Sequence, residues 1–139
     1  MAGKKEKSGM TAKAKKKNAI ASAAIKKGTG KIRVNKRDVL TLQPAYITEF
    51  ILEPLELAGS TAQEVDIDIT TKGGGFMGQA VAARAAIAKS ILDYRHGDEK
   101  LKKRMIAYDR MLLVDDPRRV EPKKQLGPKA RAKKQKSKR

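Results

Sequence analysis

The sequence of 139 residues contains no cysteine and no tryptophan, and it has a single histidine, His96. Without cysteine, the chain can form no disulfide, offers no thiolate nucleophile and cannot bind zinc through sulfur. One histidine cannot build a histidine-rich metal site, and a general base needs an orienting partner that the sequence does not provide. The sequence therefore predicts no metal site and no catalytic residues.

Long apolar runs and aromatic residues are also scarce. No stretch approaches the roughly 20 apolar residues that cross a bilayer, and the charged start MAGKKEKSG is not followed by the apolar stretch of a signal peptide. The two Phe and three Tyr residues are too scattered to form a platform for stacked bases, so we expect most of them in the core. The prediction is a cytoplasmic protein without a membrane partner.

Basic charge, in contrast, is abundant and unevenly distributed. Lys and Arg number 33 against 15 Asp and Glu, which gives a net charge of +18. Seven lysines and one glutamate give residues 1–18 a charge of +6, and eleven Lys or Arg with one Glu give residues 118–139 a charge of +10. We therefore divide the chain into a basic N-terminal arm (1–18), a globular core (19–117) and an extended basic C-terminal tail (118–139).

Blocks of like charge repel themselves and stay extended until a polyanion neutralises them. The tail has Val120 and Leu126 as its only large aliphatic residues, so it cannot form a core of its own. It also lacks the apolar face of a membrane-surface helix. A nucleic acid is therefore the expected partner. The alternative is a tail that only increases solubility and has no specific partner.

Alternating apolar and polar residues predict the strands. Residues 64–71, EVDIDITT, form the clearest strand, with Asp66 and Asp68 expected on a solvated face rather than as an acid–base pair. Two shorter apolar stretches, 19–25 and 31–34, flank the glycine-containing KKGTG and predict a β-hairpin.

Helical spacing of apolar residues predicts three helices, at 43–59, 78–97 and 98–113. Pro54 is expected to end or kink the first helix, and Gly59 and Gly97 to stop the first and second. The run Asp115-Asp116-Pro117 is expected to end the third helix rather than to bind Mg²⁺. The order β-β-α-β-α-α predicts an α+β fold, a mixed α/β sandwich.

The stretch KGGGFMGQA, residues 72–80, contains the dinucleotide-binding pattern G-x-G-x-x-G at Gly73, Gly75 and Gly78. That pattern also requires a second parallel strand after the helix, ending in an acid about 20 residues on. Asp93 stands at that distance but falls inside the predicted helix. The glycines are better explained by a tight turn from strand to helix and by the close approach of another backbone.

A loop without side chains at a helix N-terminus can also lie against an RNA phosphate. The first helical turns would contribute further contacts. The residues expected to contact RNA here are Gly73, Gly74, Gly75, Gln79 and Arg84.

Four blocks of the sequence resemble the family of the ninth protein of the small ribosomal subunit. They are KKKNAIASAAIKKGTGKIRVN (15–35), EPLELAG (53–59), GGGFMGQAVAARAAIAKSIL (73–92) and DDPRRVEPKKQLGPKARAKKQKSKR (115–139). The resemblance covers about residues 8–139, and the second block looks like the archaeal version. It implies a sheet of about four strands with helices on one face, similar to the second domain of another small-subunit ribosomal protein.

The resemblance also implies a place on the head of the small subunit, bound to the 3′ domain of its RNA and beside neighbouring small-subunit proteins. The tail is expected to reach the anticodon stem-loop of the peptidyl-site tRNA with Ser137, Lys138 and Arg139. Contacts to ribosomal RNA are expected from the basic residues of arm and tail, namely Lys15, Lys16, Lys17, Arg118, Arg119, Lys123, Lys124, Lys129, Arg131, Lys133, Lys134 and Lys136.

The resemblance therefore implies a structural RNA-binding protein without enzymatic activity, cofactor or small-molecule substrate. Two other classes stay open at this point. One is an architectural nucleic-acid-binding protein with basic arms. The other is a dinucleotide-dependent enzyme that uses the loop of residues 73–78.

Overall fold

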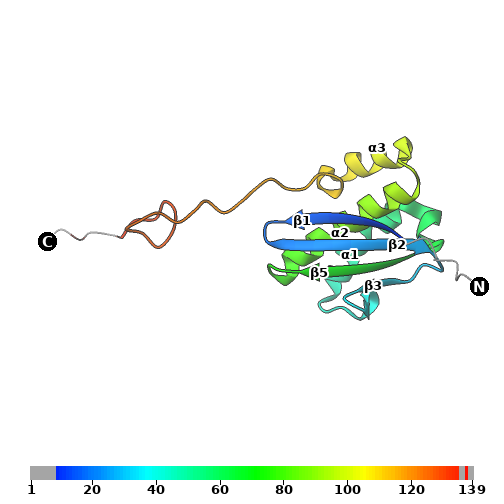
Figure 1. Ribbon diagram of the computed structural model, residues 1–139, viewed down its shortest axis with the longest axis horizontal. Coiled ribbons are helices and arrows are strands. Elements are labelled where there is room, and N and C mark those ends of the chain that lie inside the picture. The colour runs from blue at the N-terminus through cyan, green and yellow to red at the C-terminus, as the bar shows by residue number, and fades with distance from the viewer. Residues whose placement is uncertain (1–8, 135–136, 138–139) are drawn as a thin grey trace, which may run out of the picture.

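The computed structural model describes residues 9–134 and residue 137. Helices cover one face of a β-sheet, and the C-terminal segment leaves this body and extends far from it (Figure 1). The elements in chain order are β1 (Met10–Lys16), β2 (Ala19–Lys27), β3 (Ile32–Val34), β4 (Arg37–Asp38), a 3-10 turn (Val39–Thr41), α1 (Ala45–Ala58), a 3-10 turn (Gly59–Gln63), β5 (Val65–Lys72), α2 (Phe76–Tyr94), α3 (Glu99–Tyr108) and a 3-10 turn (Arg110–Leu112).

The sheet has five strands in the order β1-β2-β5-β3-β4. Strand β5 is antiparallel to β2 and parallel to β3, so it separates the two segments that the sequence predicted to pair as a hairpin. That prediction is wrong because β2 and β5 are long enough to pair over eight residues, whereas β3 has only three. The loop between β2 and β3 instead crosses the end of β5, where the Gly28 N–H donates to the carbonyl of Glu64 at 2.8 Å.

The expectation of an extended arm is wrong for residues 10–16, which form the edge strand β1. This strand pairs with β2 from Met10 opposite Ile25 to Lys16 opposite Ala19. Its small residues Ala12 and Ala14 are buried, while Lys13 and Lys15, which alternate with them, are exposed. The period-two alternation of a strand is therefore present in the sequence. Its signal is weak because alanine is only slightly hydrophobic and the alternating residues are lysines. The α+β class is confirmed, with five strands rather than about four.

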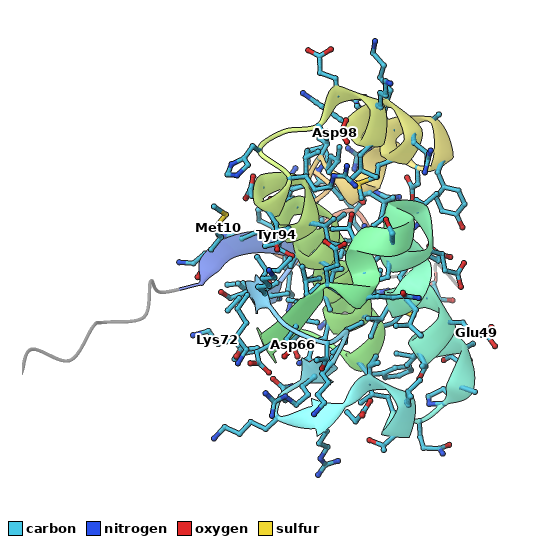
Figure 2. The ribbon with its side chains drawn as sticks, turned by 90° about the vertical axis from the view of Figure 1, so that its right-hand side faces the viewer. Met10, Glu49, Asp66, Lys72, Tyr94 and Asp98 are labelled. Atoms are coloured by element: carbon cyan, nitrogen blue, oxygen red, sulfur yellow. The ribbon has the colours of Figure 1, made fainter. Side chains whose placement is uncertain are left out.

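The core lies between the sheet and the helices. Val65, Ile67 and Ile69 of β5 are fully buried, as the alternation predicted. Alanines dominate the facing surfaces of β2 and α2, and small side chains let a helix pack closely on a sheet. Figure 2 shows Glu49 of α1 on the helical side of the sheet and Lys72 of β5 on the opposite side.

Two helices differ from the prediction in their extent. Helix α1 continues through the buried Pro54 to Ala58, so this proline does not end it, whereas Gly59 caps it as expected, with φ of 63°. The predicted helix 98–113 is two elements, because Asp109 is extended and accepts from the Met111 N–H at 2.8 Å. Asp109 therefore stops α3 and begins a separate 3-10 turn.

Candidate nucleic-acid interface

The glycine loop between β5 and α2 packs against the turn between β1 and β2. Gly73 and Gly74 have φ of 76° and 63°, a region that side chains disfavour. A Cβ on Gly73 would meet the carbonyl oxygen of Asn18, and one on Gly74 would come within 3.1 Å of Ala19. Both functions expected of these glycines, a sharp turn and the close approach of another backbone, are confirmed.

The same geometry does not support a dinucleotide site. In the part of the chain that the structure describes, α2 leads to α3 and no parallel strand follows it. The strand parallel to β5 is β3, which precedes it in the sequence. Asp93 lies within α2 and not at the end of a strand. Nor does any group of three His, Asp or Glu side chains among the described residues have the arrangement of a metal site.

A hollow of about 320 Å³ lies where this loop meets the β1–β2 turn. Lys16, Lys17 and Asn18 line it from one side, and Gly74, Gly75 and Gly78 from the other. Gly75 is the N-cap of α2 and provides no side-chain cap for the free N–H groups of the first turn. Free N–H groups and two nearby lysines attract anions.

The side chain of Gln79 stabilises this loop through two hydrogen bonds. Its Nε2 donates to the carbonyl of Gly73 at 3.1 Å, and its Oε1 accepts from the Thr71 hydroxyl at 3.3 Å. Its amide therefore has partners in the protein, which supports the loop that was expected to meet RNA.

Arg84, also expected to contact RNA, is only 7% exposed. Its guanidinium pairs with Glu53 at 2.6 Å and with Asp109 at 2.8 Å, and it stacks 4.4 Å from the ring centre of Phe50. A contact with RNA does not fit this placement. The residue ties α1, α2 and the segment after α3 together. The charge of Glu53 also raises the pKa of the neighbouring Tyr108.

The aromatic residues are less buried than the sequence predicted. Tyr46, Phe76 and Tyr108 are each more than half exposed, whereas Phe50 and Tyr94 pack partly against the core. The prediction that most are core residues is wrong, because the core is filled by alanine and β-branched side chains instead.

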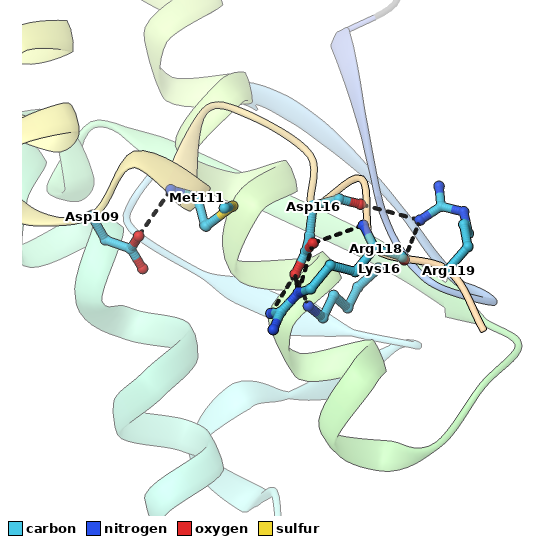
Figure 3. Close-up of polar contacts among 6 residues, drawn as sticks. All are labelled: Lys16, Asp109, Met111, Asp116, Arg118 and Arg119. Carbon is cyan, nitrogen blue, oxygen red and sulfur yellow. Dashed lines mark hydrogen bonds and ion pairs between the residues drawn. The ribbon is translucent and has the colours of Figure 1, made fainter. Parts of the chain in front are cut away.

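The start of the tail is fixed to the body by Asp116, which is 6% exposed (Figure 3). Its carboxylate accepts from the ammonium of Lys16 and from Arg118 through the backbone N–H at 3.0 Å, Nε at 2.9 Å and Nη2 at 2.6 Å. These bonds, those from Arg118 first, hold the pKa of Asp116 far below its usual range, and the carboxylate raises the pKa of Arg118. The backbone oxygen of Asp116 accepts from Arg119 Nη1 at 3.1 Å.

Asp115 makes a separate connection, to Lys89 of α2 at 2.7 Å. The sequence assigned both acids only to ending a helix and missed these ion pairs. The available signal was the spacing of Asp116 and Arg118, because a carboxylate two residues before an arginine can bond both its backbone and its side chain.

These ties bring together predicted RNA-binding residues from opposite ends of the sequence. Lys16, Lys17, Arg118 and Arg119 line a hollow of about 500 Å³ together with Val120. Lys16 and Lys17 also line the hollow at the glycine loop, so the two hollows form one basic surface. We call this surface the basic end. It lies at the end of the body from which the tail departs (Figure 1). Lys15 is exposed on the adjoining strand β1.

Beyond the basic end, the described part of the tail has no helix or strand. Arg131 and Lys124 pair with Glu121 at 2.9 and 3.7 Å. The other predicted RNA-binding residues in the described part of the tail are exposed, namely Lys123, Lys129, Lys133 and Lys134. Ser137 is exposed as well, whereas Lys136, Lys138 and Arg139 lie outside the described residues.

Nothing in the described part of the chain is a helix long and apolar enough to cross a membrane. Comparisons with known proteins show the family to which the chain belongs. Three relatives, each named small ribosomal subunit protein uS9, come from Methanococcus maripaludis strains C5, C7 and S2. Each is 45% identical over 127 residues, which cover 88% of this chain and 92% of the relative. Residues 14–139 match the family described as ribosomal protein S9/S16. The chain therefore belongs to the ribosomal protein S9/S16 family.

Proposed function

We propose that this protein is a structural constituent of the small ribosomal subunit and binds the 3′ domain of its RNA, in the head, through the basic end. The observation that supports this most directly is the convergence of Lys16 and Lys17 with Arg118 and Arg119 around one hollow. These cations come from segments about 100 residues apart, so the fold, rather than local sequence, assembles them.

The chemistry of the basic end suits a phosphate backbone. Lysine offers a point charge, and arginine offers a planar fork of donors that matches phosphate oxygens. Free N–H groups at the start of α2 add donors without side chains. Such contacts position a protein on a folded RNA without reading its bases.

The tail would extend this contact towards the peptidyl-site tRNA. An extended chain advances about 3.3 Å per residue, so the 18 residues that follow Arg119, up to Ser137, span at most about 60 Å. That reach supports a contact of Ser137, Lys138 and Arg139 with the anticodon stem-loop while the body stays on the head, beside neighbouring small-subunit proteins. Along this path Lys123, Lys124, Lys129, Arg131, Lys133, Lys134 and Lys136 would follow ribosomal RNA. In this proposal the protein works in cytoplasmic ribosomes.

The family is structural and not enzymatic, so the dinucleotide-dependent alternative is set aside. An architectural DNA-binding protein would share the basic arms but not the partner. Sedimentation separates the two. The protein should travel with small subunits on a sucrose gradient at moderate salt, and a Lys17→Gln/Arg119→Gln variant should be lost from them at lower salt. Sedimentation at the top of the gradient for the unmodified chain would contradict the proposal.

A further inference from the structure

The basic end contains a buried acid directly beneath its cations. Asp116 is 6% exposed, and it bonds Lys16 and Arg118, two of the four cations that line the larger hollow. A carboxylate at a phosphate-binding surface repels the ligand, and the surface attracts RNA less strongly for its presence. Simple charge arithmetic therefore predicts that the protein would bind RNA better without this acid.

The geometry of Arg118 indicates the opposite, because Asp116 uses only part of its guanidinium, whereas the Lys16 side chain is 18% exposed. The guanidinium of Arg118 gives its Nε and one Nη2 donor to the carboxylate, and its side chain is nevertheless 76% exposed. An arginine has five N–H donors and a lysine has three. Arg118 thus keeps donors on Nη1 and Nη2 that are directed away from the carboxylate.

Arg119 is held by the same short segment. Its Nη1 donates to the backbone oxygens of Asp116 and Arg118, at 3.1 and 2.9 Å (Figure 3). Long basic side chains otherwise lose rotamer freedom when they bind, which weakens binding. The hydrogen bonds to Asp116 already restrict the rotamers of Arg118 and Arg119 before any RNA binds.

We propose that Asp116 is a positioning residue for RNA binding, which holds Lys16 and Arg118 in the arrangement that meets phosphate. This inference rests on the proposed function. The acid does not touch the RNA. It converts two flexible cations from distant segments into one ordered phosphate-binding group, and the gain from this order exceeds the repulsion that its charge adds.

The test compares two isosteric variants of the full chain, Asp116→Asn and Asp115→Asn. Each removes one negative charge, and the two positions are adjacent. Asp115, however, is 44% exposed at its side chain and pairs with Lys89, which is not one of the cations of the basic end. Affinity is measured for a transcript of the 3′ domain of archaeal small-subunit RNA at roughly 50 to 200 mM salt.

Asp116→Asn should bind about threefold or more weaker than the wild type, because ordering each freed side chain on the RNA carries an entropic cost. Its salt dependence should be shallower by about 0.7 in slope for each phosphate that the variant no longer neutralises. Asp115→Asn should bind as well as the wild type or better. If Asp116→Asn binds as tightly as Asp115→Asn with an unchanged slope, the inference is overturned.

A double-mutant cycle with Arg118→Gln shows whether the acid acts through this cation. With Arg118 already removed, Asp116→Asn should weaken binding less than it does in the wild type, because only Lys16 is then released. Additive losses would contradict a positioning role. Circular dichroism and thermal unfolding of each variant separate these effects from loss of fold. A wild type without salt-dependent binding would overturn the proposed function as well, whereas a wild type that binds while the cycle fails would overturn only the role of Asp116.

Discussion

At the scale of single residues, the basic side chains of this protein divide by burial. Arg84 lies inside the body between two carboxylates and a phenylalanine ring, whereas Lys17 and Arg119 line an open hollow. Positive charge alone therefore does not identify a residue that binds RNA. Burial and partners decide which cations stabilise the fold and which are available to a ligand.

The first prediction concerns Arg84→Met. Removing the cation leaves Glu53 and Asp109 without their partner, and both are only partly exposed. Breaking a fully buried pair costs about 3–5 kcal/mol, so we expect the free energy of unfolding in urea to fall by about 2–3 kcal/mol. Arg104→Met, whose arginine is exposed and donates to the carbonyl of Leu57, is the control and should cost less than about 1 kcal/mol. Unchanged stability with weaker RNA binding would instead make Arg84 an RNA contact.

The second prediction concerns two glycines of one loop. Gly73→Ala places a Cβ at positive φ and against the carbonyl oxygen of Asn18, so we expect it to lower the free energy of unfolding by at least roughly 1–2 kcal/mol. At Gly75, φ is −98° and the space around an added atom is open, so Gly75→Ala should cost less, no more than about 1 kcal/mol for an alanine at the N-cap. Thermal unfolding of both variants checks this difference. Equal effects at the two positions would mean that the contact with Asn18 is unimportant.

The third prediction concerns acid. Asp66 accepts from the backbone N–H groups of Lys31 at 3.0 Å and Thr29 at 2.8 Å, and these bonds lower its pKa. A carboxyl whose pKa is lower in the folded state stabilises the protein above its unfolded pKa, about 3.9, and this contribution is lost as pH falls towards the folded pKa. Wild type should therefore exceed Asp66→Asn in stability near neutral pH, and the difference should shrink below about pH 4. Urea unfolding at several pH values measures it, and a difference that stays constant would contradict the assignment.

At the scale of elements, the sequence predicted those whose signals are local. Strand β5 alternates large β-branched residues with acids, and α2 is rich in alanine with glycines before its start, so both were found near their true positions. Strand β1 and the partner of β3 were not, because a strand built from alanine and lysine has a weak signal and pairing depends on residues far along the chain. Pro54 shows the same limit, since burial against the core overrides its tendency to end a helix.

The fourth prediction tests β1 as part of the body. Deleting residues 1–17 removes the seven residue pairs between β1 and β2. It also removes the buried Ala12 and Ala14 and exposes the core that they cover. With each hydrogen bond contributing about 1 kcal/mol, stability should fall by roughly 3 kcal/mol or more. Deleting residues 1–8 keeps the whole of β1 and serves as the control. Circular dichroism and urea unfolding measure both, and equal stability of the two truncated chains would show that β1 is dispensable.

At the scale of the whole molecule, the predicted RNA-binding residues divide into those that meet at the basic end and those that lie along the tail. Lys16, Lys17, Arg118 and Arg119 were each predicted from charge and resemblance, but nothing in the sequence indicated that they meet. The carboxylate of Asp116 bonds two of them, Lys16 and Arg118, and a search for basic residues passes over this acid. The contact of the tail with RNA stays a prediction, because its exposed cations do not converge on one surface as those of the basic end do.

The fifth prediction concerns the far end of the tail. Deleting residues 137–139 removes residues well beyond the basic end, so small subunits should assemble with the shortened protein. Binding of tRNA at the peptidyl site should weaken, because two cations are removed from the segment proposed to reach it. Filter binding of tRNA to purified subunits measures the effect, with Lys123→Gln/Lys124→Gln as the control that removes two cations nearer the body. Full tRNA affinity in the shortened subunits would exclude the proposed contact.

The ion pair between Lys16 and Asp116 also has a consequence for the order of events during synthesis. Its two residues are 100 positions apart. At about 5–20 residues per second, a ribosome needs roughly 5–20 s to make the second after the first. The two halves of the basic end therefore stay apart for most of translation, and they can join no earlier than when little more than the tail is left to be made. A nascent chain therefore cannot assemble this anion-binding surface until the body beneath it is nearly complete.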